Sequence, residues 1–455
     1  MKILVSAAGP LRGQVGGGQT YVRHEVAELA RRGHDVVLVS ERPFVEGDPP
    51  DPRREEALEG LPAWTIGTAG PEGEGGDWTQ RNASPLAALR NLLDHIAPDF
   101  VHINGMKSLL VHVANEAGLA HAVTAHHPVV VCPAGTMLRP NERICPRPAG
   151  PQVCISCFCR QRRFGSTLGA LLGIAPTRLL TVSRNAARRL RASKFVITGL
   201  SYPEGVLRHL EDRRVALDNA QCWIAPSTAA KRLLELNGVI PSRIQLVPHG
   251  IQPLRRGEPC RVDRPLRFGY LGQINRAKGV HILMRAFAQL PHELASELHV
   301  YGAPQRPGEA EYFNSHVAPH RSETVSLHGR IDPSEVQSAM ESVDVLVVPS
   351  IILEIFGLVV LEALSAGRPV IATRCGGPED TIRDGVDGLL VRPNDHKSLA
   401  AAMTRLAVNR REVRQMAEAI QPVRTIGEHV DHLTRVFRGL MGSPGADGSG
   451  AQTRA

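Results

Sequence analysis

The chain has 455 residues, which is long enough for two domains that each bury a core of their own. Its 53 Lys and Arg residues exceed its 45 Asp and Glu residues, and the net charge of +8 favours anionic partners of no particular class. No apolar run reaches the length of a bilayer crossing, and the start, MKILVSAAGP, is typical of a first β-strand rather than of a signal peptide. We therefore expect a cytoplasmic protein, in which disulfides are disfavoured.

The N-terminal half alternates strand and helix patterns. KILVSAA, a glycine-rich loop and YVRHEVAELARRGHDVVLVS predict a strand, a loop, a helix and a second strand, which is a βαβ unit. Further apolar runs that end in polar residues follow at DFVHIN, HAVTAHH and RLLTVS. The loops at 44–60 and 67–79, rich in Pro, Gly and acidic residues, are expected to line the rim of a cleft.

The second half repeats this alternation after a Pro- and Arg-rich linker at 253–265. Its predicted strands are LRFGYLG, ELHVYG, VDVLVVPS, RPVIAT and GLLVRP. We predict two doubly wound α/β domains, residues 1–252 and 266–441, which face each other across a cleft. The tail, residues 442–455, has the composition of a disordered segment.

Two glutamates stand out in the segment PSIILEIFGLVVLEALSAGRPVIAT, residues 349–373. A helix is predicted from near Gly357 to the glycine stop at Gly367, which places Glu354 in the preceding loop and turns Glu362 inward. The helix N-terminus between them suits a phosphate, and each carboxylate could accept hydrogen bonds from sugar or ribose hydroxyls. The alternative is that both are solvated helix residues.

These segments resemble glycosyltransferase family 4, the retaining GT-B enzymes that use nucleotide sugars. The resemblance extends over nearly the whole chain and rests on the Glu354–Glu362 segment, GQINRAKG upstream and GGPEDTIRDGVDGLLV downstream. GGGQTYVRHEVAELARRGHDV matches the family's N-terminal glycine loop and helix, and VTAHH, VSRNAARRL and LVPHGI lie between in the expected order. It implies a GT-B fold and sugar transfer with retention, in which the leaving phosphate deprotonates the acceptor.

The resemblance also implies roles for individual residues. Lys278 would contact the donor phosphates, Glu362 the ribose and Glu354 the donor sugar. Gln273 departs from the family, whose members usually have arginine there, and brings no charge. Backbone N–H groups would be presented to sugar and phosphate by Phe356, Gly357 and Leu358.

In the N-terminal domain, Gly16, Gly17 and Gly18 are expected to allow close backbone approach beneath the donor. These glycines could instead belong to a dinucleotide-binding site with Glu41 as the ribose ligand. That interpretation is disfavoured, because the loop from Gly9 to Gly18 is too long for a GxGxxG turn. His126 matches the family's histidine near the reacting sugar, although a histidine at a strand end is often structural. The sequence contains no Asp-x-Asp pair, which disfavours a metal-dependent GT-A transferase, and no cofactor is expected for catalysis.

Five cysteines lie within 28 residues of an insert at 132–159. Cys154 and Cys157 have chelate spacing, and Cys132 and Cys145 could complete a structural zinc site. Cys159 leaves the ligand set open, and an iron–sulfur cluster or unliganded thiols are the alternatives. Some members of the resembled family carry a similar insert.

From Arg143 to Pro203 the chain has eleven Arg or Lys residues and neither Asp nor Glu. Such a stretch suits an anionic membrane surface or an acceptor with a lipid phosphate, and a solvated helix face is the alternative. Nucleic acid is not expected, because no recognition motif accompanies the charge.

The resulting hypothesis is a cytoplasmic retaining glycosyltransferase, peripheral at the inner face of the membrane if the basic stretch binds lipid. It would move a sugar from a UDP- or GDP-linked donor to a glycan or lipid-linked glycan precursor. A sugar-nucleotide epimerase of the same fold and a non-catalytic binder of anionic surfaces or nucleic acid are the rival readings.

Overall fold

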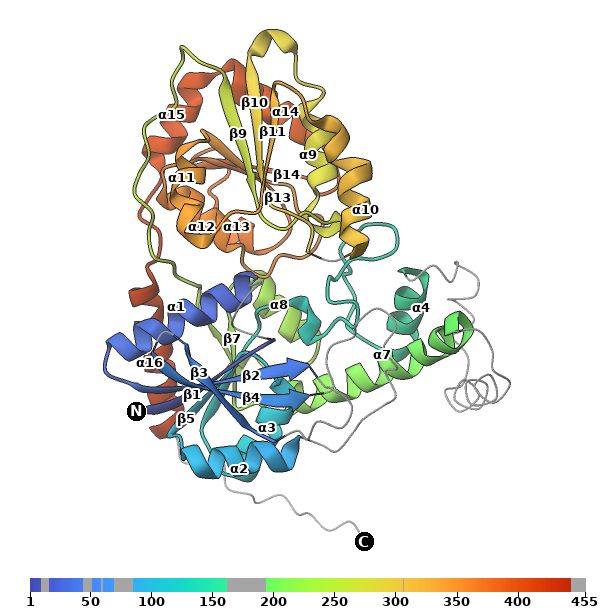
Figure 1. Ribbon diagram of the computed structural model, residues 1–455, viewed down its shortest axis with the longest axis vertical. Coiled ribbons are helices and arrows are strands. Elements are labelled where there is room, and N and C mark those ends of the chain that lie inside the picture. The colour runs from blue at the N-terminus through green and yellow to red at the C-terminus, as the bar shows by residue number, and fades with distance from the viewer. Residues whose placement is uncertain are drawn as a thin grey trace.

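The computed structural model describes residues 1–9, 16–43, 51–58, 60–68, 85–161, 194–305 and 307–442. These residues form two α/β domains, one above the other in Figure 1, each built on its own sheet. The predicted architecture of two doubly wound domains is confirmed.

The N-terminal domain is built on an eight-stranded sheet of order β3-β4-β2-β1-β5-β6-β7-β8, parallel except for the β3–β4 pair. Apolar residues alternate along β1, with Leu4 in the core on one face and Ile3 and Val5 in the core on the other. Both faces are covered by helices, which is why the central strands are buried throughout. The strands are β1 Lys2–Ala7, β2 Asp35–Pro43, β3 Arg53–Leu58, β4 Leu61–Thr68, β5 Phe100–Ile103, β6 His121–Thr124, β7 Cys222–Ala225 and β8 Ile244–Leu246.

The helices of this half, in chain order, include two long ones, α1 and α7. The α-helices are α1 Gly17–Arg31, α2 Leu86–Ile96, α3 Lys107–Glu116, α4 Pro151–Gln161, α7 Lys194–Asn219 and α8 Thr228–Leu236. Short 3₁₀ helices occupy Pro128–Val130 and Pro241–Arg243.

The C-terminal domain has a six-stranded parallel sheet of order β11-β10-β9-β12-β13-β14. Val345 and Val347 face one core cluster, and Leu346 and Val348 face the other, so this sheet is also buried on both sides. The strands are β9 Leu266–Leu271, β10 Ser296–Tyr301, β11 Val325–Gly329, β12 Val345–Val348, β13 Val370–Thr373 and β14 Gly388–Val391.

Helices connect these strands and cover the sheet. They are α9 Val280–Phe287, α10 Pro307–His316, α11 Val336–Glu341, α12 Leu358–Ser365, α13 Gly377–Thr381, α14 His396–Val408 and α15 Arg410–Ala419. Short 3₁₀ helices occupy η3 Arg276–Lys278, η4 His292–Leu294, η5 Ala318–His320 and η6 Pro333–Glu335.

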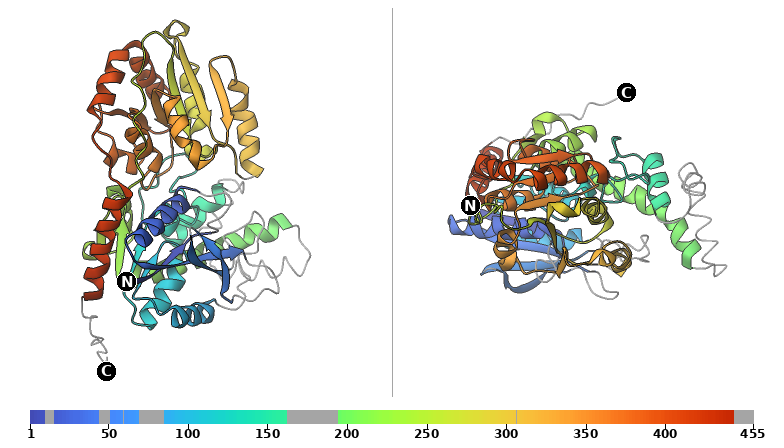
Figure 2. Two further views of the ribbon diagram at one scale, coloured as in Figure 1. Left: turned by 60° about the vertical axis from the view of Figure 1, so that its left-hand side comes forward. Right: turned by 90° about the horizontal axis from the view of Figure 1, so that it is seen from above.

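The last helix, α16 Ile426–Gly442, does not pack on the C-terminal domain in which its sequence position placed it. Its apolar residues Val430, Leu433 and Phe437 join the N-terminal core, and Phe437 stacks on Phe100 with ring centroids 4.2 Å apart. Figures 1 and 2 show it running down the side of the N-terminal domain near α1. The predicted end of the C-terminal domain at residue 441 is therefore wrong. Because its apolar face packs on the N-terminal core, α16 belongs to the N-terminal domain.

The predicted loop at 44–60 is also corrected in part, because residues 53–58 form the antiparallel edge strand β3. Its sequence, RREEAL, is highly charged, which suits an exposed edge that must not pair with other chains. The predicted linker at 253–265 contains neither helix nor strand. Residues 44–50 and 69–84, the RLLTVS stretch, the tail from 443 and most of the acid-free basic stretch lie outside the described residues.

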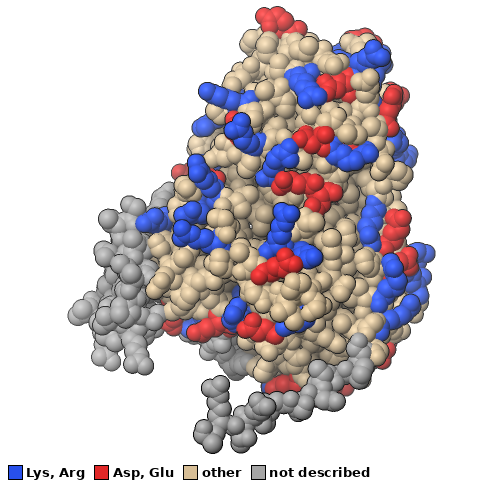
Figure 3. Space-filling model, turned by 180° about the vertical axis from the view of Figure 1, so that it is seen from behind, with Lys and Arg blue, Asp and Glu red and all other residues tan. Residues whose placement is uncertain are grey.

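Within the described ranges, every helix falls short of a membrane span in length or in apolar character. On the face drawn in Figure 3, Lys and Arg side chains alternate with Asp and Glu over both domains instead of forming a patch of one sign.

Candidate functional site

Four loops meet at the points where the strand order of the two sheets reverses. In the N-terminal sheet these loops follow the neighbouring strands β1 and β5, and in the C-terminal sheet they follow β9 and β12. Ligands of doubly wound domains bind at such points, outside the carboxyl ends of the strands. The glycine turn at 16–18, Lys278 and Glu354 all lie on these loops.

Glu354 is fixed in the loop between β12 and α12 by its backbone. Its N–H donates to the carbonyl of Cys375 at 2.8 Å, and its carbonyl accepts from the N–H of Gly377 at 2.8 Å. A Cβ atom on Gly377 would lie 2.3 Å from Cα of Phe356, so only glycine allows this close approach. The double glycine at 376–377 therefore holds the loop against the start of α13.

The carboxylate of Glu354 is paired with Lys278. Lys278 Nζ donates to Glu354 Oε1 at 2.6 Å, and Ser350 Oγ donates to the same oxygen at 2.6 Å. Burial raises the pKa of the Glu354 carboxyl, but the charge and hydrogen bonds of Lys278 and Ser350 outweigh it and lower the pKa overall. Glu354 is therefore ionised near neutral pH.

Gly279 sets the position of Lys278. It has φ of +72°, and a Cβ there would lie 1.9 Å from the carbonyl oxygen of Pro349. The N–H of Ile351 donates to the carbonyl of Ala277 at 3.0 Å. The Lys-Gly segment is thus packed directly on the loop that carries Glu354.

Glu362 lies on the second turn of α12, as predicted. Burial raises the pKa of its carboxyl to about 7. None of the hydrogen bonds or ion pairs among the described residues involves this carboxyl group. When this carboxyl group ionises, both of its oxygens can accept hydrogen bonds from the hydroxyl groups of a ligand.

The helix α12 begins directly after Gly357, and its first N–H groups have no partner within the helix. Gly16 and Gly17 of the N-terminal domain lie opposite this helix. A Cβ on Gly17 would lie 3.9 Å from Leu358 Cδ1, and one on Gly16 would lie 3.6 Å from Gln273 Nε2. Both distances are ordinary van der Waals contacts, and a Cβ on Gly18 would meet nothing within 4 Å. The close backbone approach beneath the donor expected of the three glycines stays a prediction.

His126 follows β6 and lies half-buried beside this group of loops. Its Nε2 lies 2.5 Å from Asn104 Oδ1, and its ring centroid lies 4.7 Å from that of Tyr21. Burial, reinforced by the charge of Lys107, lowers the pKa of His126 well below the usual value. The imidazole is therefore neutral, and it can exchange hydrogen bonds but carries no charge.

Sequence reasoning did not single out three aromatic side chains near His126: Tyr21 and His249 contact its ring, and His429 contacts those two rings. His249, from LVPHGI, stacks on His126 at 5.2 Å between centroids and contacts the ring of Phe356 at 5.0 Å. The Nδ1 atom of His429, on α16, lies 2.7 Å from the carbonyl oxygen of Pro248, so Nδ1 carries the proton. The other ring nitrogen, Nε2, therefore accepts a hydrogen bond from the hydroxyl of Tyr21. Of these three residues, only His249 could have been found from the sequence, because it lies in the segment LVPHGI. Tyr21 and His429 come from α1 and α16 and reach the site only through tertiary packing.

A buried lysine was also missed. Burial, together with the charge of Arg213, lowers the pKa of Lys107 to about 7 despite the opposing effect of Glu41. Its ammonium donates to the carbonyl of Asn104, whose side-chain Nδ2 is buried with no hydrogen-bonding partner. Lys107 and Asn104 thus place unused donor capacity next to His126.

The insert cysteines divide into two groups. Cys132, Cys145, Cys154 and Cys157 line one small pocket, whereas Cys159 does not line it and is fully buried in the adjoining apolar cluster. Within the described residues, no three His, Cys, Asp or Glu side chains stand at metal-binding distances in this arrangement.

Family models match both domains of this chain. Residues 15–255 match the model described as Glycosyltransferase Family 4, and residues 265–409 match the one described as Glycosyl transferases group 1. The chain belongs to glycosyltransferase family 4. Its Lys278, Glu354 and Glu362 lie in the segment that the second model covers.

A D-inositol 3-phosphate glycosyltransferase of Thermomonospora curvata is similar to this family member. The two are 30% identical over 279 residues, a stretch that is 55% of this chain and 64% of that relative. The match thus spans less than two thirds of the relative's length.

Solved structures share the fold at low sequence identity. A sucrose-phosphate synthase from Thermosynechococcus elongatus aligns with a TM-score of 0.62 at 21% identity, covering 96% of this chain and 98% of that one. HepE of Anabaena, solved in complex with UDP and glucose, aligns with a TM-score of 0.63 at 16% identity, covering 96% and 99%. The GT-B fold expected for this family member is confirmed.

Proposed function

We propose that this protein is a retaining glycosyltransferase that uses a nucleotide-diphosphate sugar, UDP- or GDP-linked. The observation that carries the proposal is the arrangement of Lys278, Glu354 and Glu362 around the N-terminus of α12, facing Gly16 and Gly17 of the other domain. Each group matches one part of such a donor. The crystal complexes of HepE with UDP and glucose are consistent with a donor in this fold.

In this proposal Lys278 and the N-terminus of α12 stabilise the diphosphate as it departs. Glu354 accepts hydrogen bonds from the donor sugar, and Glu362 accepts them from the ribose. Phe356, Gly357 and Leu358 present backbone N–H groups beside them. In the absence of donor, Glu354 balances the charge of Lys278, so the diphosphate would take over a cation that is already in place.

We place the acceptor beside His126, where Asn104 and Lys107 offer donors. Because Arg213 adds a second basic side chain near Lys107 and the relative from Thermomonospora curvata is named for D-inositol 3-phosphate, we propose a hydroxylated acceptor that carries an anionic group. A small phosphorylated polyol and a glycan precursor linked to a lipid phosphate share this chemistry. His126 would then hydrogen-bond to the reacting sugar rather than transfer a charge, since it is neutral.

The test measures release of nucleoside diphosphate from UDP- and GDP-sugars, with D-inositol 3-phosphate, unphosphorylated inositol or an undecaprenyl-phosphate-linked glycan as acceptor. We expect release that depends on one phosphorylated acceptor, and a loss of about a hundredfold or more in turnover for Glu354→Gln. The acceptor that supports release identifies the source of the phosphate. Isomerisation of the donor sugar without any acceptor would overturn the proposal in favour of an epimerase, and donor binding with no turnover of any kind would favour a non-catalytic binder.

A further inference from the structure

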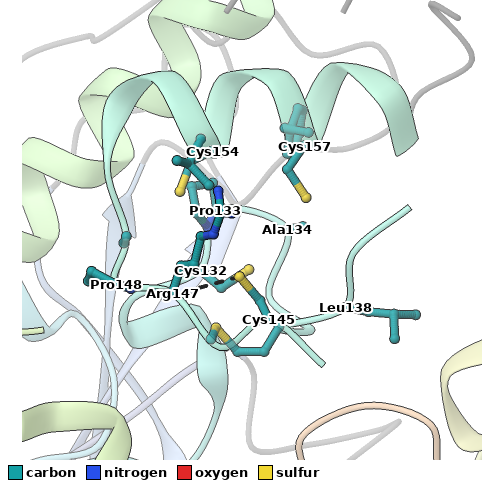
Figure 4. A pocket seen from close by; sticks show the side chains of 13 residues that line it. Cys132, Pro133, Ala134, Leu138, Cys145, Arg147, Pro148, Cys154 and Cys157 are labelled. Atoms are coloured by element: carbon teal, nitrogen blue, oxygen red, sulfur yellow. Dashed lines mark hydrogen bonds between the residues drawn. The ribbon is translucent and has the colours of Figure 1, made fainter. Parts of the chain in front are cut away.

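The insert brings four thiols to one place. Cys154 and Cys157 lie on α4, and Cys132 and Cys145 lie on the loop that faces this helix (Figure 4). The pocket they line encloses about 30 Å³, and its other walls include Met137 and Phe158. All four cysteines are free in the structure.

The fifth thiol does not share this pocket. Residues three apart on a helix point to the same side, as Cys154 and Cys157 do, whereas Cys159 is turned away from both. Cys159 is fully buried in a cluster with Ile155 and Val206 of α7. The sequence leaves the ligand set open among five cysteines. In the structure, four of them line the pocket and Cys159 does not.

N–H groups are directed at two of the four sulfurs. The backbone N–H of Gly150 donates to Cys154 Sγ at 3.4 Å, and the side-chain amide of Gln161 donates to Cys157 Sγ at 3.8 Å. Donors around the ligand atoms are typical of metal–thiolate sites.

We propose that Cys132, Cys145, Cys154 and Cys157 bind one structural zinc ion. Four thiolates satisfy the tetrahedral preference of zinc and leave no position for substrate. The sulfurs do not stand at coordinating distances as they are, and binding gathers them by rotation about the single χ1 angle of each cysteine. This proposal does not rest on the proposed transferase activity.

The metal would hold the base of a hairpin that reaches the other domain. The N–H of Cys145 donates to the carbonyl of Met137 at 2.6 Å, and Leu138 pairs with Ile144, which leaves Glu142 at the tip. Glu142 accepts from Arg276 Nε at 2.6 Å and from Asn394 Nδ2 at 3.1 Å. Arg276 and Lys278 belong to the same short helix, so the hairpin connects the proposed zinc site to the donor loop.

The experiment measures zinc and iron by mass spectrometry in full-length protein purified without chelators. We expect about one zinc per chain in the wild type. Cys154→Ser and Cys145→Ser should lose it, while Cys159→Ala, the matched control from the same helix, should keep it. Glu142→Gln should also keep it, because this substitution removes the negative charge at the tip and leaves the ligands intact.

A spectroscopic measurement covers the case in which the serine variants fail to fold. Wild-type protein with cobalt in place of zinc should show the sulfur-to-metal charge-transfer band and the d–d bands of a tetrahedral thiolate site. Wild-type protein without metal, zinc that persists in Cys154→Ser, cobalt bound without a charge-transfer band, or iron in place of zinc would each overturn the proposal.

Discussion

Glu362 is a carboxylic acid whose ionisation differs between the folded and the unfolded chain. Its pKa is raised to about 7 by burial, whereas the same group in the unfolded chain ionises near its ordinary value of 4.5. Between these two pKa values the unfolded chain has released the proton and the folded protein still holds it. The stability of the protein therefore decreases as pH rises through this window, and the full cost is present above pH 7.

Glu362→Gln should accordingly stabilise the unliganded protein at pH 8 by about 1–3 kcal/mol and have little effect near pH 4.5. The lower part of this range allows for the partial solvent exposure of the side chain. Denaturant titrations of both proteins at the two pH values measure the difference. An equal effect at both pH values would show that the carboxyl group is not held protonated by its surroundings.

The spacing of individual residues predicted where three side chains of the C-terminal domain lie, while their roles stay predictions. Glu354 lies in the loop after β12, Glu362 on the second turn of α12 and Lys278 in the short helix η3 after β9. Tyr21, Lys107 and His429 were not predicted, because they come from three different helices and are adjacent only after folding. Gly18 lies on the first turn of α1 and faces open space, and its expected position beneath the donor stays a prediction.

At the scale of elements, α16 is the clearest case of a helix assigned to the wrong domain by its position in the sequence. Its amphipathic pattern predicts burial against an apolar surface but does not say which surface. The interactions that decide it are long-range ones, including Tyr21 with His429 and Arg32 with Asp431. The edge strand β3 was missed because its sequence, RREEAL, does not alternate apolar and polar residues. It pairs with β4 through the backbone and through a hydrogen bond from Thr65 Oγ1 to Glu55 Oε1.

Phe437→Ala should therefore destabilise the N-terminal domain, by about 3–5 kcal/mol if the cavity left against Phe100 does not collapse. All three tryptophans of the chain, at 64, 78 and 223, belong to the N-terminal half, so tryptophan fluorescence reports the unfolding of that domain. The substitution should move the tryptophan transition to lower denaturant concentration. Phe268→Ala, in the core of the other domain, is the matched control and should act mainly on the transition followed by circular dichroism. A tryptophan transition unchanged by Phe437→Ala would contradict this placement of α16.

At the scale of the whole molecule, the two domains are joined by polar contacts, by two chain crossings and by apolar contacts of Ile355 and Leu358 with the N-terminal core. Thr228 donates to Asp380 through its N–H at 2.6 Å, Ser227 donates to the carbonyl of Ile355, and Glu142 pairs with Arg276. The chain crosses between the domains at the linker and again before α16. The groups assigned to the donor also come from both domains. Their spacing therefore depends on the relative orientation of the two domains.

The central claim is that a nucleotide diphosphate binds between Lys278, the N-terminus of α12 and Glu362. The most direct test is calorimetric titration of UDP and of GDP into the wild type, Lys278→Ala and Glu362→Ala at pH 8, where Glu362 is ionised. We predict that the wild type binds one of the two nucleotides and that each substitution weakens it by about ten- to a hundredfold, the loss expected for one charge-assisted contact. Wild-type protein that binds neither nucleotide, or both variants with unchanged affinity, would contradict the account.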